Sequence, residues 1–214
     1  MTDEVLHVRR VEELPKAIVA AGVLIGTGIV ANGRVPAWEE RGFALVNRWS
    51  GRLEPVLWVP MQLGSLFGPI IVGALAWLRW RRWRPAVGAV LVGILAWQLA
   101  KVVKNFVERG RPLDELADVI RRAGTPTDGL GFVSGHSTVA FALATVLSPY
   151  LSRPARWAAY GLAATVALAR IHVGAHLPLD TVGGAALGCL LGWTYHLIVG
   201  VPEDVPGIRW SDAG

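Results

Sequence analysis

Residues 169–180 read ARIHVGAHLPLD, and they stand between two apolar runs at about 157–170 and 179–199. This stretch places four ionisable side chains, those of Arg170, His172, His176 and Asp180, within strongly apolar sequence. Ionisable groups in or beside a membrane span cost free energy, and they are by default candidates for a functional site. The stretch therefore predicts a site at the ends of two membrane-spanning helices.

The composition is that of an integral membrane protein. Of the 214 residues, 53% are hydrophobic and 17% are charged, whereas a soluble domain carries roughly a quarter charged residues. We predict an all-α fold, a single domain over residues 1–214 built as a bundle of six transmembrane helices of about 20 residues each. The spans are expected at about 17–31, 56–78, 86–103, 136–151, 157–170 and 179–199.

The first apolar run is expected to be a retained span rather than a cleaved signal peptide, because Glu12 and Glu13 precede it. Gly22 and Gly26 have the spacing of a helix-packing face. Residues 39–49, between the first two spans, are predicted to form a short amphipathic helix at the membrane interface.

The sixth span carries Gly184, Gly188 and Gly192 at four-residue spacing, which predicts close packing against a neighbouring helix. The single cysteine, Cys189, lies in the same apolar run and excludes an internal disulfide or a thiolate metal cluster. We interpret it as a small packing residue.

Six spans place the loops after spans one, three and five on one face of the membrane. The basic turns at 79–84 and 153–156 follow spans two and four, and short basic loops favour the cytoplasm. Residues 104–136 and 170–180 then share one face, which we expect to be the extracytoplasmic face of a bacterial inner (plasma) membrane. A raw count of Lys and Arg does not decide the orientation, because that face also carries Arg34, Arg41, Arg48 and Arg52. The net charge of +5 indicates anchoring to the membrane rather than nucleic-acid binding, because no basic face is free of membrane.

Two cations mark the end of the third span, in the sequence KNFVERGRP at 104–112. Lys104 and Arg111 are seven residues apart, which on a continuous helix brings them to one side, although Gly110 and Pro112 indicate that the helix is ending. Converging cations suit a phosphate. The alternative is a solvated basic stretch beside lipid headgroups.

A second motif, FVSGHST at 132–138, comes directly before the fourth span. Ser134 is a candidate N-cap, and Gly135 lets the backbone approach a ligand closely. His136 then stands on the first turn, at a helix N-terminus that favours an anion. Alone, the motif is more often that of a plain helix cap with an interfacial histidine.

The third motif contains the histidine on which the hypothesis depends. Pro178 disfavours helix at Leu177, so His176 is expected on a turn just before the sixth span. Asp180 follows in the first helical turn, where a carboxylate is favourable in itself and where it can fix the tautomer of His176. His172 is interpreted as a nearby loop residue.

Taken together, Lys-x6-Arg-Pro, Ser-Gly-His and Arg-x5-His-x3-Asp, in this order, resemble the three-part signature of the type 2 phosphatidic acid phosphatase family. Two positions depart from that pattern: Val133 stands where proline is usual, and Ala169 stands where serine is usual. Neither departure removes a group with assigned chemistry, but both bear on loop geometry.

The resemblance implies a membrane lipid phosphate phosphatase that works without metal or cofactor. His176 would attack phosphorus to form a phosphohistidine, Asp180 would orient it, and His136 would serve as acid and then base. The implied site residues are the catalytic His176, His136 and Asp180 and the phosphate-binding Lys104, Arg111, Ser134, Gly135 and Arg170.

A site at the membrane interface suits a lipid whose phosphate lies at headgroup level. Polyprenyl diphosphate is the leading expected substrate, with phosphatidylglycerol phosphate and phosphatidic acid as alternatives. A membrane transporter or a non-catalytic anionic-lipid-binding protein is the rival interpretation, although transporters more often set charges along a path through the membrane. The oligomeric state, and whether loop 113–130 is a lid or a solvated connection, stay open.

Overall fold

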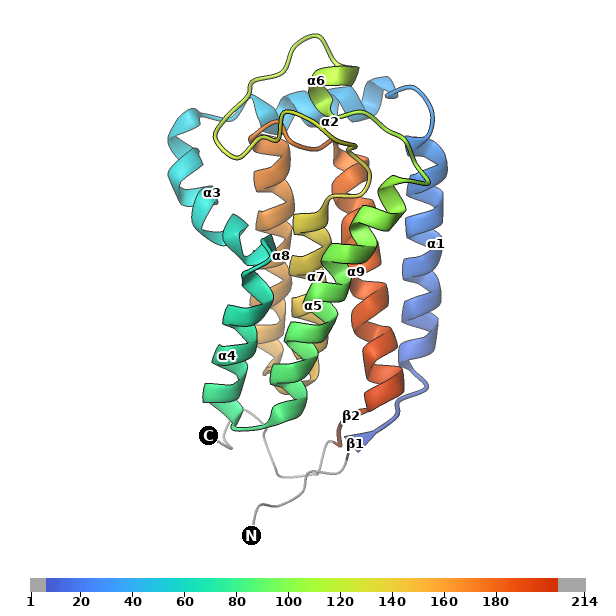
Figure 1. Ribbon diagram of the computed structural model, residues 1–214, viewed down its shortest axis with the longest axis vertical. Helices are drawn as coiled ribbons and strands as arrows, with labels where there is room; N and C mark the ends of the chain where they lie inside the picture. Colours follow the sequence, from blue (N-terminus) through green and yellow to red (C-terminus); the bar gives the residue numbers. More distant parts are fainter. Residues whose placement is uncertain (1–6, 204–214) are drawn as a thin grey trace.

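The computed structural model describes residues 7–203, which are mostly helical (Figure 1). The longest helices are α1 (Glu13–Ala31), α5 (Trp83–Lys104), α8 (Arg153–His172) and α9 (Pro178–Val199), joined in the bundle by α4 (Gly68–Trp80) and α7 (Gly135–Leu147). Helix α7 is central, because it contacts α5, α8 and α9. Its position at the middle of the bundle explains why nine of its 13 residues are buried.

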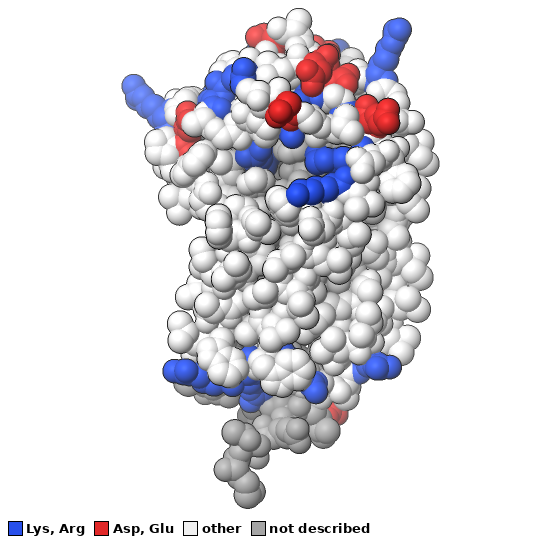
Figure 2. Space-filling model, in the orientation of Figure 1, with Lys and Arg blue, Asp and Glu red and all other residues white. Residues whose placement is uncertain are grey.

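Within the described residues, three helices are long and apolar enough to cross a membrane, namely α1, α5 and α9. A fourth span results if the bent pair around α4 is counted as one. Figure 2 shows the charged side chains gathered at the two ends of the molecule, with an uncharged band between them. The protein is therefore a membrane protein, and the count of six spans stays a prediction because α7 has only 13 residues.

The second expected span, 56–78, is not one continuous helix. It is broken into α3 (Glu54–Met61), the 3-10 turn η2 (Gln62–Gly64) and α4, and the two parts are bent by 78°. A Cβ on Gly64 would lie 2.6 Å from the backbone oxygen of His136. The break therefore lets η2 approach the start of α7 closely, a tertiary contact that the apolar pattern does not register.

The glycines of α9 pack as the sequence predicts. A Cβ on Gly184 would lie 2.6 Å from the oxygen of Ser134, and a Cβ on Gly188 would lie 2.3 Å from the oxygen of Thr138. A Cβ on Gly192 would likewise lie 2.5 Å from the side chain of Thr145. Helices α7 and α9 thus approach so closely that their contact leaves no room for side chains at these positions.

The packing face predicted at Gly22 and Gly26 is wrong. Among the described residues, an added Cβ at either position meets no atom within 4 Å. Helix α1 packs on α9 through its other side, where Ala17 and Ala20 are buried and a Cβ on Gly28 would lie 3.6 Å from the Phe132 ring. The spacing of small residues alone did not identify the contacting side.

We expect Gly188→Ala to destabilise the protein by about 1–3 kcal/mol, because a methyl group must displace backbone atoms of α7. Gly161→Ala on α8 is the matched control, since its new Cβ meets nothing within 4 Å in the described structure. Thermal unfolding in detergent measures both. Equal behaviour of the two variants would show that the α7–α9 contact is looser than described.

The end that carries the three motifs is covered by α2 (Ala37–Asn47), the 3-10 turn η1 (Gly51–Leu53) and α6 (Pro112–Glu115). Helix α2 agrees with the amphipathic helix expected at 39–49. The far end carries the 3-10 turn η3 (Ser148–Tyr150) and the short antiparallel strands β1 (His7–Val8) and β2 (Val201–Pro202). The N- and C-terminal ends of the described chain therefore lie away from the motifs.

Loop 113–130 is more than a solvated connection. Arg122 donates to the backbone oxygens of Trp49, at 2.9 Å, and of His172. Asn47 both donates to and accepts from the backbone of Ile120 at 2.9 Å. These contacts fasten the loop to α2 and to the end of α8, so the loop is a fixed cover over this end of the bundle.

Candidate active site

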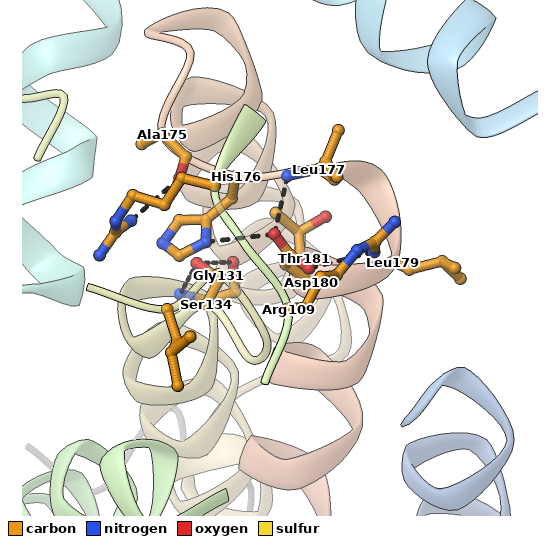
Figure 3. Close-up of polar contacts among 12 residues, drawn as sticks. Arg109, Gly131, Ser134, Ala175, His176, Leu177, Leu179, Asp180 and Thr181 are labelled. Atoms are coloured by element: carbon orange, nitrogen blue, oxygen red, sulfur yellow. Dashed lines mark hydrogen bonds and ion pairs between the residues drawn. The ribbon is translucent and has the colours of Figure 1, made fainter. Parts of the chain in front are cut away.

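His176 lies on the turn between α8 and α9, as the sequence predicts. Pro178 opens α9, and Asp180 stands in its first turn, where its Oδ2 accepts a hydrogen bond from the Leu177 N–H at 2.8 Å. Nδ1 of His176 lies 3.5 Å from the same Oδ2 (Figure 3). The ring therefore presents Nδ1 to the carboxylate and turns Nε2 away from it.

Three cations from different segments surround His176: Lys104 at the end of α5, Arg111 before α6 and Arg170 in the last turn of α8. The side chain of His176 is 4% exposed. Burial, and then the charges of these cations, hold the pKa of His176 well below its ordinary range. The imidazole is consequently neutral at pH 7, and one ring nitrogen has a lone pair available.

Two of the cations are held by loop 113–130 and its neighbours. Nζ of Lys104 donates to the backbone oxygens of Leu130 at 2.6 Å and Gly131 at 2.9 Å. Nε of Arg111 donates to the oxygen of Asp128 at 2.8 Å, and its Nη1 to that of Ala175 at 3.1 Å. These acceptors are neutral carbonyls, so their hydrogen bonds fix the cations without cancelling the charge that would attract an anion.

Arg170 is 3% exposed, and its guanidinium contacts the same loop. Its Nη1 donates to the oxygen of Gly124 at 3.2 Å and lies 3.4 Å from the sulfur of Met61. Its Nε has no hydrogen-bond partner within the described residues. A buried donor without a partner is costly, and a bound phosphoryl oxygen would satisfy it.

The Ser-Gly-His motif opens α7. Ser134 is the N-cap, as expected: its Oγ accepts from Ser137 N at 3.5 Å and from Ser137 Oγ at 3.1 Å. Its N–H donates to the backbone oxygen of Asp180 at 2.8 Å, which joins the start of α7 to the start of α9. Because Ser134 Oγ accepts these bonds, its own proton can be donated to a ligand.

Gly135 and His136 follow as the first two residues of α7. Gly135 therefore offers one of the unpaired N–H groups of a helix start. His136 is half-buried and lies close to Arg170 and His176. The structure thus brings all eight residues singled out from the sequence to one end of the bundle.

One reason given for that convergence is wrong. Helix α5 ends at Lys104, so Lys104 and Arg111 do not share a helix face. They converge because residues 105–111 turn back over the bundle, where the N–H of Gly131 donates to the oxygen of Arg109 at 2.7 Å. Gly110 and Pro112, the signals of a helix end, identified the correct conformation.

The other histidines lie elsewhere. His172 is the last residue of α8 rather than a loop residue, and its Nδ1 is 3.3 Å from the oxygen of Val46 in α2. His196 lies at the far end of α9, where its Nδ1 is 3.5 Å from a Glu13 carboxylate oxygen. His172 therefore contacts α2, the helix that covers the site, and His196 belongs to the helix interface at the other end of the bundle.

Sequence reasoning missed two buried charged residues, Arg109 and Glu39. Arg109 lies between Lys104 and Arg111 and donates to both Glu39 and Asp180. A buried carboxylate such as that of Asp180 needs a cationic partner, and this requirement could have led to Arg109. Glu39 gave no such signal, because it reads as an ordinary residue of an amphipathic helix.

Within residues 7–203, no group of three or more His, Cys, Asp or Glu side chains is arranged to hold a metal ion. The charged side chains nearest to His176 are instead cations, those of Lys104, Arg111 and Arg170. Such a set of groups repels metal ions and attracts anions.

Comparison with known proteins places these features in a family. The chain is 30% identical over 121 residues to phosphatidylglycerophosphatase B of Bacillus subtilis, covering 52% of this chain and 55% of that protein. It is 38% identical over 112 residues to decaprenylphosphoryl-5-phosphoribose phosphatase of Mycolicibacterium smegmatis, covering 52% and 58%. The match thus spans little more than half the length of these curated relatives.

Two solved structures share the fold. The crystal structure of a transmembrane PAP2 type phosphatidylglycerolphosphate phosphatase from Bacillus subtilis has a TM-score of 0.66 at 21% identity, covering 86% of this chain and 96% of that one. Aquifex aeolicus LpxE has a TM-score of 0.63 at 25% identity, covering 75% and 95%. Residues 83–202, which include all three motifs, match the family model described as PAP2 superfamily. The chain belongs to the PAP2 superfamily.

Proposed function

We propose that this protein is a membrane lipid phosphate phosphatase that acts through a phosphohistidine on His176. One observation carries the proposal: a buried, neutral histidine faces a carboxylate on one side and is surrounded by three cations. Phosphoryl transfer asks mainly for positioning and for stabilisation of negative charge on the transferred group. Lys104, Arg111 and Arg170 supply that charge stabilisation.

In the first step, the Nε2 lone pair of His176 attacks phosphorus and forms a P–N bond while the P–O bond to the lipid breaks. The leaving oxygen takes a proton from His136. Asp180 stabilises the positive charge that develops on the His176 ring. Covalent catalysis of this kind divides one difficult displacement into two easier ones.

In the second step, His136 accepts a proton from a water molecule whose oxygen attacks phosphorus. The P–N bond breaks, His176 recovers its lone pair, and inorganic phosphate leaves. Ser134 Oγ and the N–H of Gly135, at the start of α7, donate to the phosphoryl oxygens in both steps. The positive end of the α7 dipole favours the same anion.

A lipid is the substrate class that fits the surroundings of the site. An apolar pocket of about 260 Å³ lies between α4, α7 and α8, lined by residues such as Leu75, Leu143 and Val166. Its lining includes Leu63, the neighbour of Gly64, which packs against His136. A hydrocarbon chain lying in this pocket keeps its phosphate at the level of the three motifs.

Among lipids, a polyprenyl diphosphate of cell-envelope synthesis is our leading candidate. One relative is named for a decaprenylphosphoryl compound and another for phosphatidylglycerophosphate, so phosphatidylglycerol phosphate and phosphatidic acid are tested beside it. The proposed location is the bacterial inner membrane, with six spans and the site on the extracytoplasmic face. The basic turn at 79–84 lies where α4 leads into α5, at the opposite end of the bundle (Figure 1), and supports that orientation.

Purified protein in detergent should release inorganic phosphate from at least one member of a panel containing these three lipid classes. Soluble sugar phosphates, which have no chain for the apolar pocket, serve as the control and should be poor substrates. Binding of the lipids without phosphate release would indicate an anionic-lipid-binding protein. Uptake into vesicles without phosphate release would indicate a transporter.

We expect phosphate release to be unchanged after incubation with EDTA and dialysis, because the proposed electrophilic groups are Lys104, Arg111 and Arg170. The rate before and after chelation, with and without added Mg²⁺, measures this. Loss of activity on chelation and recovery on adding the metal would contradict the proposed mechanism.

A further inference from the structure

A buried ion pair joins α2, which covers the site, to an arginine that contacts Asp180. Nη1 and Nη2 of Arg109 lie 3.1 and 2.5 Å from the two carboxylate oxygens of Glu39, and both side chains are almost fully buried, at 1% and 0% exposed. Nη1 of Arg109 is also 3.3 Å from Oδ1 of Asp180. Arg109 thus stands between two carboxylates, one of which faces His176.

Glu39 also binds directly to the helical turn that carries Asp180. Its Oε1 accepts from the N–H of Leu179, at 2.8 Å, in the first turn of α9. Hydrogen bonding to Glu39 and the charge of Asp180 raise the pKa of Arg109, although burial opposes this. The guanidinium is therefore permanently charged, and its position is fixed from α2.

The charges of this group do not cancel. Arg109 contributes one positive charge, while Glu39 and Asp180 contribute two negative charges, so the buried group carries a net charge of –1. If Glu39 were neutral, Arg109 and Asp180 would form a balanced ion pair. The negative electrostatic potential that the group exerts at His176 would then be weaker. A buried net charge acts strongly on neighbouring groups, because little water screens it.

We propose that Glu39 and Arg109 are positioning residues of the hydrolytic site. Glu39 holds Arg109, and Arg109 holds Oδ1 of Asp180, so that Oδ2 remains directed at His176. Glu39 also keeps the group negative, which stabilises the positive charge that the His176 ring acquires when it binds phosphorus. The proposal gives α2 a part in the chemistry and rests on the phosphatase function proposed above.

Three variants separate this role from a merely structural one: Glu39→Gln, Arg109→Met and the double variant. The readouts are kcat, KM and the acid limb of the pH–rate profile with one lipid phosphate. The charged and titratable groups facing His176 and Asp180 from other elements, Lys104, Arg111, His136 and Arg170, are the same in every variant. The lipid's own ionisation is also common to all, so differences in the acid limb report the altered charge.

We expect Glu39→Gln to lower kcat with little change in KM, since Glu39 does not touch substrate. Outer partners of catalytic ligands in metal sites typically contribute about 10- to 100-fold, and we expect a loss in that range. Removing a negative charge disfavours protonation, so the acid limb should move to lower pH. Arg109→Met also lowers kcat, but removing a positive charge moves the acid limb to higher pH.

The double variant restores the net charge to –1, and its acid limb should return close to that of the wild type. Its kcat should stay low, because Asp180 is no longer held. Glu40→Gln is the matched control: Glu40 is the next residue of α2 and is exposed. It should leave kcat and the profile unchanged.

Gel filtration and thermal unfolding establish that each variant is folded. If Glu39→Gln or Arg109→Met fails to fold, Arg109→Lys tests the positioning role instead. This variant keeps the positive charge but loses the two-nitrogen contact with Glu39, so kcat should fall while the acid limb stays at the same pH. Unchanged kcat in folded Arg109→Lys, or acid limbs that do not move in opposite directions in the two charge-removing variants, would overturn the proposal. Failure of the wild type to release phosphate would instead refute the phosphatase function itself.

Discussion

His176→Ala should fold and insert normally but lose phosphate release by about 10⁴-fold or more, the scale seen when a covalent nucleophile is removed. The loss is large because the other groups of the site can hold a phosphate but none replaces the attacking nitrogen. The fold should survive, since the contact that Nδ1 of His176 makes with Asp180 is long, at 3.5 Å. Asp180 also keeps its bonds to Leu177 and Arg109. Phosphate release in detergent, normalised to folded protein, measures the effect.

His172→Ala is the matched control. This histidine is equally buried and lies only four residues away, but its ring contacts the oxygen of Val46 instead of the cationic cluster. We expect a less stable protein that retains most of its activity per folded molecule. Substantial activity in His176→Ala, or an equal loss in both variants, would contradict the assignment of the nucleophile.

His136→Asn should lower the turnover of a lipid phosphate by about 10²- to 10⁴-fold, the usual contribution of a general acid–base group. The lipid alkoxide needs a proton as it leaves, and the water that attacks the phosphohistidine must lose one. An aryl phosphate separates the two demands, because a nitrophenolate leaves without a proton. With that substrate the variant should show a burst of nitrophenol followed by slow turnover, as the phosphorylated enzyme accumulates.

Ser137→Ala serves as the control for His136→Asn. Ser137 is the next residue of α7, and its hydroxyl bonds to Ser134. Ser137→Ala should weaken the helix cap without changing which of the two steps limits the rate, so no burst is expected. If His136→Asn shows no burst with the aryl phosphate, His136 does not act in the second step. A lipid phosphate hydrolysed at the wild-type rate would remove it from both.

Most of the helices were predictable because each is an apolar run with a recognisable end. Pro178 and Asp180 set the start of α9, and Ser134 sets the start of α7. The bend within 56–78 was missed, although Gly68 and Pro69 open α4 and mark a local break in the apolar run. An apolar run reports that a segment is buried or faces lipid, but not whether it is straight.

The site shows the same division between local and distant contacts. His176 and Asp180 are four residues apart, so the turn before Pro178 sufficed to predict their proximity. Arg109 and Glu39 are 70 residues apart, and no local pattern links α2 to the segment after α5. Motif reading therefore found the groups placed to touch a phosphate but not those that hold Asp180 in position.

Trapping the covalent intermediate tests the central claim most directly. The wild type, mixed with a ³²P-labelled lipid phosphate and quenched within the first turnovers, should carry label that is stable to alkali and labile to acid, as a phosphohistidine is. Peptide mapping should place the label on His176, and His176→Ala should carry none. Turnover without labelled protein, or label on any residue other than His176, would contradict the account.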